Sequence, residues 1–228
     1  SNRNLIINGA MQVAQRGTSF DTSASASVYT MDRWNLYENT GGQLGCDQST
    51  DAPAGFLNSA LVTTDTSTTV SAAQFCLFRQ PIEGLNVGHL NWGTSNAKDL
   101  ILSFWVKSSL TGTFGGAFQN SAGNRCYPFT YSISAANTWE YKTINVAGDT
   151  TGTWLTTNGI GLWIQFGLGV GSTYSGAAGA WSSSLYFSAT GAVKLIETAS
   201  ATWQITGVQL EVGDTATPFE HRSYGDEL

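Results

Sequence analysis

Charged side chains are scarce in this chain of 228 residues, since Asp, Glu, Lys and Arg together make up only 11% of it. Soluble domains commonly carry about 25%, so the surface must take its polarity from hydroxyl and amide groups. The balance is acidic, with ten basic residues against sixteen acidic ones and a formal net charge of −6. Nucleic acids and anionic lipids require concentrated Lys and Arg. The sequence therefore argues against both as partners.

Histidine, cysteine and long apolar runs are also scarce. The only histidines, His89 and His221, accompany no Gly-x-Ser-x-Gly elbow, which argues against Ser-His-Asp catalysis. Cys46, Cys76 and Cys126 form no Cys-x-x-Cys pair, so we expect buried free thiols rather than a zinc site. No apolar run approaches the roughly 20 residues of a membrane span, and the first residues lack the pattern of a signal peptide. We expect neither membrane insertion nor a cleaved signal.

The acidic residues point to turns more than to catalysis. A glycosidase needs two carboxyl groups roughly 5 to 10 Å apart, and sixteen acids make some such pair inevitable. Most of them lie in turn-like contexts such as Gly148-Asp149-Thr150, where Asp bonds to its own backbone. We expect no catalytic residue and no cofactor. Structural calcium is compatible with loop carboxylates, although no Asp-x-Asp-x-Asp series occurs.

Alternation of apolar and polar residues with a period of two predicts strands throughout. Residues 160–168 place Ile160, Leu162, Ile164, Phe166 and Leu168 on one face, as in a half-buried strand with a polar opposite face. Residues 100–107 are apolar on both faces, which favours a central strand. Residues 120–124 predict the turn of a hairpin that joins 114–119 to 125–133.

The last predicted strand changes parity at a glycine. Trp203 and Ile205 share one parity, while Val208, Leu210 and Val212 share the other. A β-bulge at Gly207, between the two sets, would place both on the core face. No segment shows sustained helical periodicity. The sequence predicts an all-β, antiparallel two-sheet jelly-roll sandwich with little helix, spanning residues 1–228 as a single domain.

Eight tryptophans and eight tyrosines are the strongest hint of a ligand. The C–H faces of sugars stack on aromatic rings, while amides and hydroxyls bind their OH groups. Core packing is the interpretation favoured for the tryptophans on predicted strands, namely Trp34, Trp105, Trp139, Trp163 and Trp203. Turn-forming neighbours favour exposure of others. The predicted sugar-binding residues are Trp92, Asp149, Trp154, Tyr174 and Trp181, with packing of these rings under their own loops or between subunits as the alternative.

Several motifs resemble a domain of bacteriophage tail fibres. They include Asn-Leu-Ile-Ile-Asn-Gly-Ala-Met at 4–11, Leu-Ser-Phe-Trp-Val-Lys-Ser at 102–108, Gly-Asp-Thr-Thr-Gly-Thr-Trp at 148–154 and Trp-Gln-Ile-Thr-Gly-Val-Gln-Leu-Glu-Val-Gly at 203–213. The final motif is Ala-Thr-Pro-Phe-Glu-His-Arg at 216–222. The opening motif and the strands at 102–108 and 203–213 also look like jelly-roll carbohydrate-binding modules. A tail fibre of an Acinetobacter phage is one candidate member.

The resemblance implies a galactose-binding-like sandwich at the tip of a homotrimeric fibre. Its implied partners are bacterial surface polysaccharide and other tail-fibre segments, and its implied location is the virion, where it acts outside the host bacterium. Tail-fibre members tend to continue past Leu228, so we expect the C-terminal part of a longer fibre. Two alternatives remain: a structural trimerisation domain without its own ligand site, and a polysaccharide depolymerase.

Overall fold

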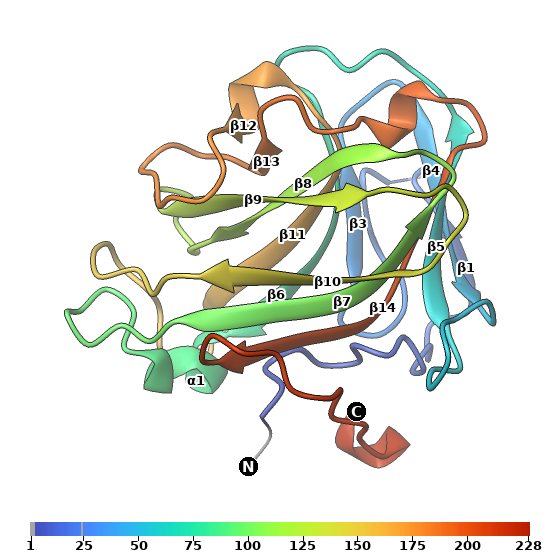
Figure 1. Ribbon diagram of the computed structural model, residues 1–228. Helices are drawn as coiled ribbons and strands as arrows, with labels where there is room; N and C mark the ends of the chain where they lie inside the picture. Colours follow the sequence, from blue (N-terminus) through green and yellow to red (C-terminus); the bar gives the residue numbers. More distant parts are fainter. Residues whose placement is uncertain (1–2, 24) are drawn as a thin grey trace.

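The computed structural model describes residues 3–23 and 25–228, and most of its regular structure is β-strand (Figure 1). Two six-stranded antiparallel sheets form a sandwich. Sheet A contains, in spatial order, β1 (Ser19–Asp21), β4 (Gln43–Ser49), β5 (Ser59–Thr66), β14 (Thr202–Val212), β7 (Leu100–Ser108) and β10 (Glu140–Val146). Sheet B contains β2 (Ser27–Tyr29), β3 (Asn35–Glu38), β6 (Phe75–Glu83), β11 (Ile160–Val170), β8 (Gly112–Gln119) and β9 (Cys126–Ile133). The predicted jelly-roll sandwich is confirmed.

Helix is minor, as predicted. The only α-helix among the described residues is α1 (Gly84–Val87), and the 3₁₀ segments are η1 (Gly88–Leu90), η2 (Ser172–Tyr174), η3 (Leu195–Glu197) and η4 (Tyr224–Asp226). None of these described helices is long and apolar enough to cross a membrane. A short parallel pair, β12 (Ser175–Gly176) and β13 (Ser188–Ala189), lies outside both large sheets.

The core lies between the facing sides of the two sheets. Phe104 on β7 contacts Phe166 on β11 with ring centroids 5.2 Å apart, which links sheet A to sheet B across the core. Trp203 is fully buried and packs against both Phe78 and Phe166. Burial of each such ring contributes on the order of 2 kcal/mol or more. The strand at 100–107 is central, as predicted, because β7 lies between β14 and β10.

The outer face of β11 differs from the prediction of a polar, exposed surface. The side chains of Leu162, Ile164, Phe166 and Leu168 face the core as expected, but Gln165 on the other face is also fully buried. The segment that carries β12 and β13 covers this side, and a methyl group on Gly167 would lie 2.8 Å from the Ser188 hydroxyl. Glycine on the outer face thus allows a second layer to approach the strand closely.

The bulge predicted at Gly207 is present. Thr206 pairs with Trp105, whereas Gln209 pairs with Ser103, so β14 has one more residue than β7 between these positions. Val208 and Leu210 are fully buried as a result, on the same side as Trp203 and Ile205. The prediction was wrong for Val212, which is 46% exposed because β14 ends there.

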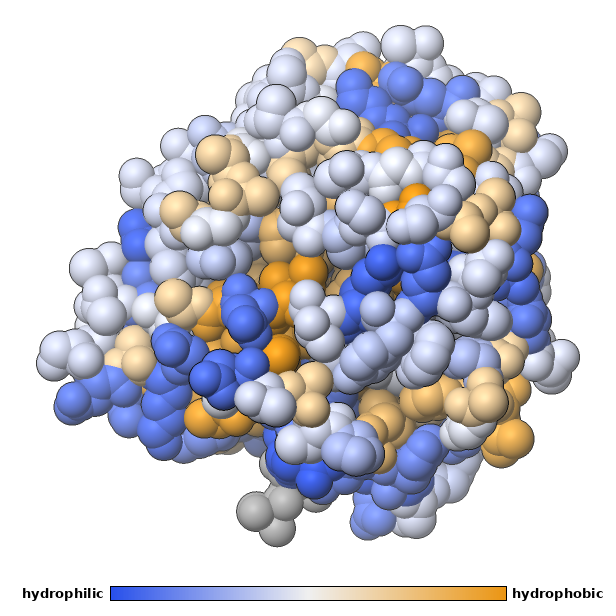
Figure 2. All heavy atoms as spheres, viewed as in Figure 1, coloured by the Kyte–Doolittle hydropathy of each residue, from blue (hydrophilic) through white to orange (hydrophobic). Residues whose placement is uncertain are grey.

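The molecular surface reflects the scarcity of charge. Much of the face in Figure 2 is pale, the colour of residues with intermediate hydropathy. Hydrophobic side chains gather at a hollow over the edge where β9 and β10 lie. This hollow is a groove of about 370 Å³ whose lining includes Tyr127, Phe129 and Ile144.

Candidate functional site

Three of the predicted sugar-binding residues meet in a tryptophan cluster formed by Trp92, Trp154 and Trp181. Their ring centroids are separated by 4.8 Å between Trp92 and Trp154, 5.2 Å between Trp92 and Trp181, and 5.3 Å between Trp154 and Trp181. Each pair is inclined at 80°, the edge-to-face arrangement that aromatic rings favour. The sequence placed these rings near turns, and the structure brings those turns together.

The polar atoms of the tryptophan cluster already have partners within the chain. The indole N–H of Trp92 donates to the Lys98 carbonyl at 2.7 Å, and that of Trp181 donates to the Ala147 carbonyl at 2.7 Å. The indole N–H of Trp154 donates to Asp149 at 3.2 Å. Three ring edges are therefore used for internal hydrogen bonds, as expected of side chains that pack beneath loops.

Asp149, the fourth predicted residue, is also within this cluster and is only 2% exposed. Arg125 donates to both of its carboxylate oxygens, at 2.7 and 2.8 Å, and the Thr151 backbone donates at 3.2 Å. Burial alone would raise the pKa of Asp149, but Arg125 and the Thr151 amide outweigh it and hold the pKa below its ordinary value. The ionised carboxylate of Asp149 thus holds the loop at residues 148–154 in place through its bonds to Arg125 and Thr151.

The cavity beside the tryptophan cluster is small. It measures about 150 Å³, and its lining includes Trp92, Trp154, Leu90 and Leu162. Ligand pockets usually measure about 300 to 1,000 Å³. The small cavity and the internal hydrogen bonds are typical of side chains that pack against one another beneath loops. Sugar binding at the tryptophan cluster stays a prediction.

Tyr174, the fifth predicted residue, lies apart from the other four. Tyr174 directly precedes β12 in the segment that covers sheet B, and its ring packs against Phe75 of β6 at 5.6 Å and against Phe187 at 5.0 Å. The structure does not bring Tyr174 into one site with the tryptophan cluster.

A larger hollow lies on the outer face of sheet A, and we call it the aromatic groove. Its volume is about 400 Å³, within the range of ligand pockets. Its lining residues are Ala54, Gly55, Phe56, Ser103, Trp105, Tyr141, Gly207, Pro218, Phe219 and His221. Aromatic side chains thus come from β7, β10, the loop between β4 and β5, and the C-terminal segment.

Two neighbouring strands provide the floor of the aromatic groove. Tyr141 on β10 pairs directly with Trp105 on β7, and their ring centroids are 5.3 Å apart at an angle of 48°. Side chains directly opposite on paired strands share one face. Tyr141 is 46% exposed, so its ring is open to solvent. Ser103, two residues from Trp105 on the same face, adds a hydroxyl to the lining.

The bulge at Gly207 shapes the groove beside this floor. Gly207 has a φ of +62°, and a methyl group at its α-carbon would lie 2.7 Å from Phe56 Cζ and 3.2 Å from Trp105 Cδ1. A glycine is required both by the backbone angle and by the close approach of Phe56. The bulge therefore places Val208 and Leu210 in the core and leaves room for Phe56 in the wall of the groove.

The opposite wall consists of rings in contact with one another. Phe56 lies 5.2 Å from Phe219 and 5.3 Å from His221, measured between ring centroids, and Phe219 lies 4.9 Å from His221. His221 is exposed, whereas Phe56 and Phe219 are partly buried. This wall combines apolar rings with an imidazole that both donates and accepts hydrogen bonds.

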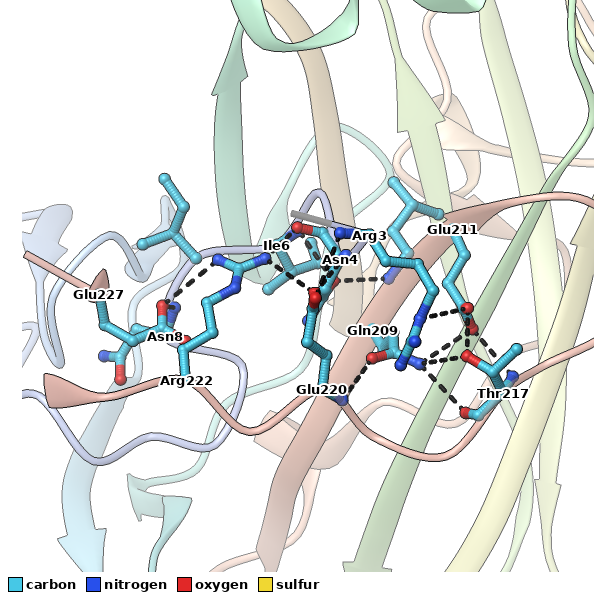
Figure 3. Close-up of polar contacts among 12 residues, drawn as sticks. Arg3, Asn4, Ile6, Asn8, Gln209, Glu211, Thr217, Glu220, Arg222 and Glu227 are labelled. Carbon is cyan, nitrogen blue, oxygen red and sulfur yellow. Dashed lines mark hydrogen bonds and ion pairs between the residues drawn. The ribbon is translucent and has the colours of Figure 1, made fainter. Parts of the chain in front are cut away.

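Polar contacts hold the C-terminal segment that carries this wall (Figure 3). Glu220 accepts from the backbone N–H of Asn4 at 2.8 Å, and its own N–H donates to Gln209 at 2.8 Å. Arg222 donates to the Asn4 carbonyl and lies 3.8 Å from Glu227. In an extended segment, successive side chains alternate in direction. Glu220 and Arg222 bind the N-terminal segment, while Phe219 and His221 line the groove.

Sequence reasoning favoured core packing for Trp105, Trp139 and Trp163, and this was wrong. Trp105 lies partly exposed on sheet A, Trp139 lies partly exposed just before β10, and Trp163 lies partly exposed on sheet B. Trp34 and Trp203 are fully buried. Strand alternation offered a signal, because Leu102, Phe104 and Val106 have one parity and Trp105 the other. The contribution of the C-terminal segment had no comparable signal.

Among the described residues, no group of three or more His, Cys, Asp or Glu side chains is placed to hold a metal ion. Asp51, in the loop between β4 and β5, forms an ion pair with Lys107 and accepts a hydrogen bond from the Trp139 indole N–H at 3.3 Å. Hydrogen bonding to Lys107 lowers the pKa of Asp51.

No protein-family model and no curated protein matches the chain. Among solved structures, it is similar to the enzymatically active domain of tailspike protein 4 of bacteriophage CBA120, at 14% identity and a TM-score of 0.48. That similarity covers 92% of this chain and 21% of the tailspike chain, so this chain spans about a fifth of it.

Two carbohydrate-binding modules are similar over most of their length. A family 11 module from Clostridium thermocellum, solved with a β-1,3-1,4-mixed-linked tetrasaccharide, has 14% identity and a TM-score of 0.41, covering 86% of this chain and 95% of that one. TmCBM61, solved with β-1,4-galactotriose, has 7% identity and a TM-score of 0.44, covering 93% and 100%. Because these TM-scores lie below 0.5, the similarities assign neither a ligand nor an activity to this chain.

Proposed function

We propose that the chain is a non-catalytic carbohydrate-binding domain and that the aromatic groove is its ligand site. The observation that carries this proposal is the pair of Trp105 and Tyr141 on the floor of a groove of about 400 Å³. The apolar C–H face of a sugar ring stacks on such rings, since both surfaces leave water on contact. Ser103, Tyr141 and His221 supply groups that bind sugar hydroxyls.

The chemistry of the lining supports binding over cleavage. Glycoside hydrolysis uses two carboxyl groups on either side of the scissile bond. The described residues that line the groove include no Asp or Glu. Asp51, further along the face, is engaged by Lys107 and Trp139.

At a finer level, we propose attachment of a phage tail-fibre tip to bacterial surface polysaccharide as the role of this binding. The sequence motifs that resemble tail-fibre domains support this role, as does the scarcity of charged residues, which leaves hydroxyl and amide groups to make the surface polar. A trimer fits such a role, because three linked sites gain avidity of about 10² to 10⁴ without any new contact. Light scattering should give about three times the 24.2 kDa of one chain, and a monomer would contradict this assembly for the isolated chain.

A titration of bacterial polysaccharides against matched variants tests the proposed function. Tyr141→Ala should weaken binding roughly tenfold to more than a hundredfold, because a stacked ring contributes about 1 to 3 kcal/mol. Tyr224→Ala is the control, since Tyr224 is 55% exposed and lies outside the groove. Equal affinity of both variants would contradict the groove as the site. A trimer that retains no glycan would favour a structural role, and released reducing ends would identify a depolymerase.

A further inference from the structure

Arg79 occupies an unusual position on the outer face of sheet B. Its guanidinium carbon lies 4.3 Å from the centroid of the Tyr37 ring and 4.2 Å from that of the Trp163 ring. Tyr37 is on β3 and Trp163 is on β11, and β6, which carries Arg79, lies between these strands. The two rings therefore hold the guanidinium from opposite sides by cation–π contact.

No carboxylate neutralises Arg79 within the described part of the chain. The ion pairs there involve six other basic residues, which are Arg3, Arg33, Lys107, Arg125, Lys142 and Arg222. This is notable in a chain with sixteen acidic residues and ten basic ones. Burial lowers the pKa of Arg79, partly offset by Tyr37 and Tyr29. A partly buried cation without a counter-charge is costly, which makes this position a natural receptor for an anion.

The bonding of Arg79 determines which side is available. Its Nε–H donates to the Asn35 side-chain oxygen at 3.0 Å, and the Asn35 amide in turn donates to the Ser27 hydroxyl at 3.0 Å. The terminal nitrogens of Arg79, Nη1 and Nη2, donate no hydrogen bond to any described residue. They are also not among the buried polar atoms that lack a partner, so both are open to solvent. With rings against the guanidinium and Nε engaged, the terminal nitrogens form a free donor edge. Two parallel N–H groups match the two oxygens of a carboxylate.

The surroundings fit a sugar that carries the carboxylate. Asn35 pairs with Arg79 on one side and Tyr29 on the other, so these residues form a row across β2, β3 and β6. Tyr29 is 45% exposed, and Tyr37 and Trp163 are partly exposed. The rings of Tyr37 and Trp163, which can stack on a sugar, thus lie next to the positively charged Arg79. The hydroxyl groups of Tyr29 and Ser27 lie on β2, the strand next to β3.

We propose that Arg79, with Tyr37 and Trp163, is a second ligand site that binds a carboxylate-bearing sugar of the uronic-acid type. The guanidinium forms a bidentate ion pair with the sugar carboxylate, and the ring of Tyr37 or Trp163 contacts the apolar face of the sugar. This site lies on the outer face of sheet B, whereas the aromatic groove lies on the outer face of sheet A. The two sites are therefore separable by mutation.

Titration of the full chain with methyl glucuronide and with methyl glucoside tests the proposal without any variant. The two probes differ only in the charged group, so the glucuronide should bind at least tenfold more tightly, as expected for a charge-assisted pair. Its affinity should fall with added salt. Equal affinity of the two sugars would overturn the site, and equal affinity of acetate and glucuronide would overturn its assignment to a sugar.

Variants then locate the binding. Arg79→Gln should reduce glucuronide affinity at least tenfold, and Arg79→Lys should reduce it several-fold, because lysine keeps the charge but loses the planar fork. Tyr224→Ala, which changes an exposed ring that lines neither site, should leave glucuronide binding unchanged. Melting temperatures establish that each variant is folded. Retained glucuronide binding in folded Arg79→Gln would overturn the proposal, and loss of neutral-polysaccharide binding in Tyr141→Ala alone would leave it standing.

Discussion

The ring of Phe56 lies so close to the α-carbon of Gly207 that a methyl group there would stand 2.7 Å from Phe56 Cζ. Phe56 comes from the loop between β4 and β5, and Gly207 is the bulge of β14. The same glycine therefore sets which side chains of β14 face the core and leaves the space that Phe56 occupies in the wall of the aromatic groove. The sequence requirement for glycine at position 207 thus has two physical causes: its φ of +62° and the space taken by Phe56.

Substitution of Gly207 by alanine should both destabilise the fold and displace the groove wall. We expect a loss of about 1 to 3 kcal/mol in unfolding free energy, since a left-handed angle and a close contact are both violated. Chemical denaturation measures this loss. Gly191→Ala is a matched control, because Gly191 has a φ of +80° with nothing within 4 Å of the added methyl. An equal loss in both variants would assign the effect to backbone angle alone.

Alternation and parity predicted much of the fold from local residues. The inward face of β11 and the bulge of β14 followed from counting apolar positions, because a strand side chain has only two directions. The hairpin between β8 and β9 was also predicted, and Gln119 pairs with Cys126 across it. In each case, the information lay within one segment of the chain.

The candidate site needed contacts between distant segments. Phe219 and His221 reach the groove because Glu220 and Arg222 bind the N-terminal segment, and nothing local to residues 218–222 specifies that docking. Trp92, Trp154 and Trp181 were correctly associated with turns, yet their packing against one another depends on three separate loops. Local propensity does not reveal which loops meet.

Truncation of the tryptophan cluster should cost stability. Trp92 is 8% exposed, so Trp92→Ala should lower the unfolding free energy by about 3 to 5 kcal/mol, as large-to-small core changes do. Trp92→Phe should recover part of this loss, because it restores an aromatic ring to the edge-to-face contacts. Denaturant titration of both variants provides the measurement. Full stability of Trp92→Ala combined with loss of sugar binding would instead make this cluster the ligand site.

The ion pair of Arg125 and Asp149 should make stability depend on pH. The folded pKa of Asp149 lies below its ordinary value of 3.8, so the pair stabilises the fold above that pH and is lost as pH falls through the folded pKa. Asp149→Asn should therefore cost about 3 kcal/mol near pH 7, and the difference from the native chain should shrink below pH 3.8. Asp214→Asn, on an exposed turn, is the control. A loss that stays constant with pH would contradict this account.

The cysteines should be unreactive while the chain is folded. Cys46, Cys76 and Cys126 are free and buried, as the sequence predicted. Burial raises the pKa of Cys46 to about 12 and that of Cys126 to about 11, which suppresses the reactive thiolate. A thiol reagent at pH 8 should label none of them in native protein and all of them after denaturation. Rapid labelling of native protein would show that a thiol is accessible.

The central claim is that carbohydrate binds in the aromatic groove, and a crystal structure with a bound oligosaccharide tests it most directly. The oligosaccharide would come from the polysaccharide that binds most tightly in the titrations. We predict a sugar ring stacked on Tyr141 or Trp105, with hydroxyls bonded to Ser103 or His221 and no covalent change in the ligand. A neutral oligosaccharide bound at Trp92, Trp154 and Trp181, with the aromatic groove open to solvent, would contradict the account.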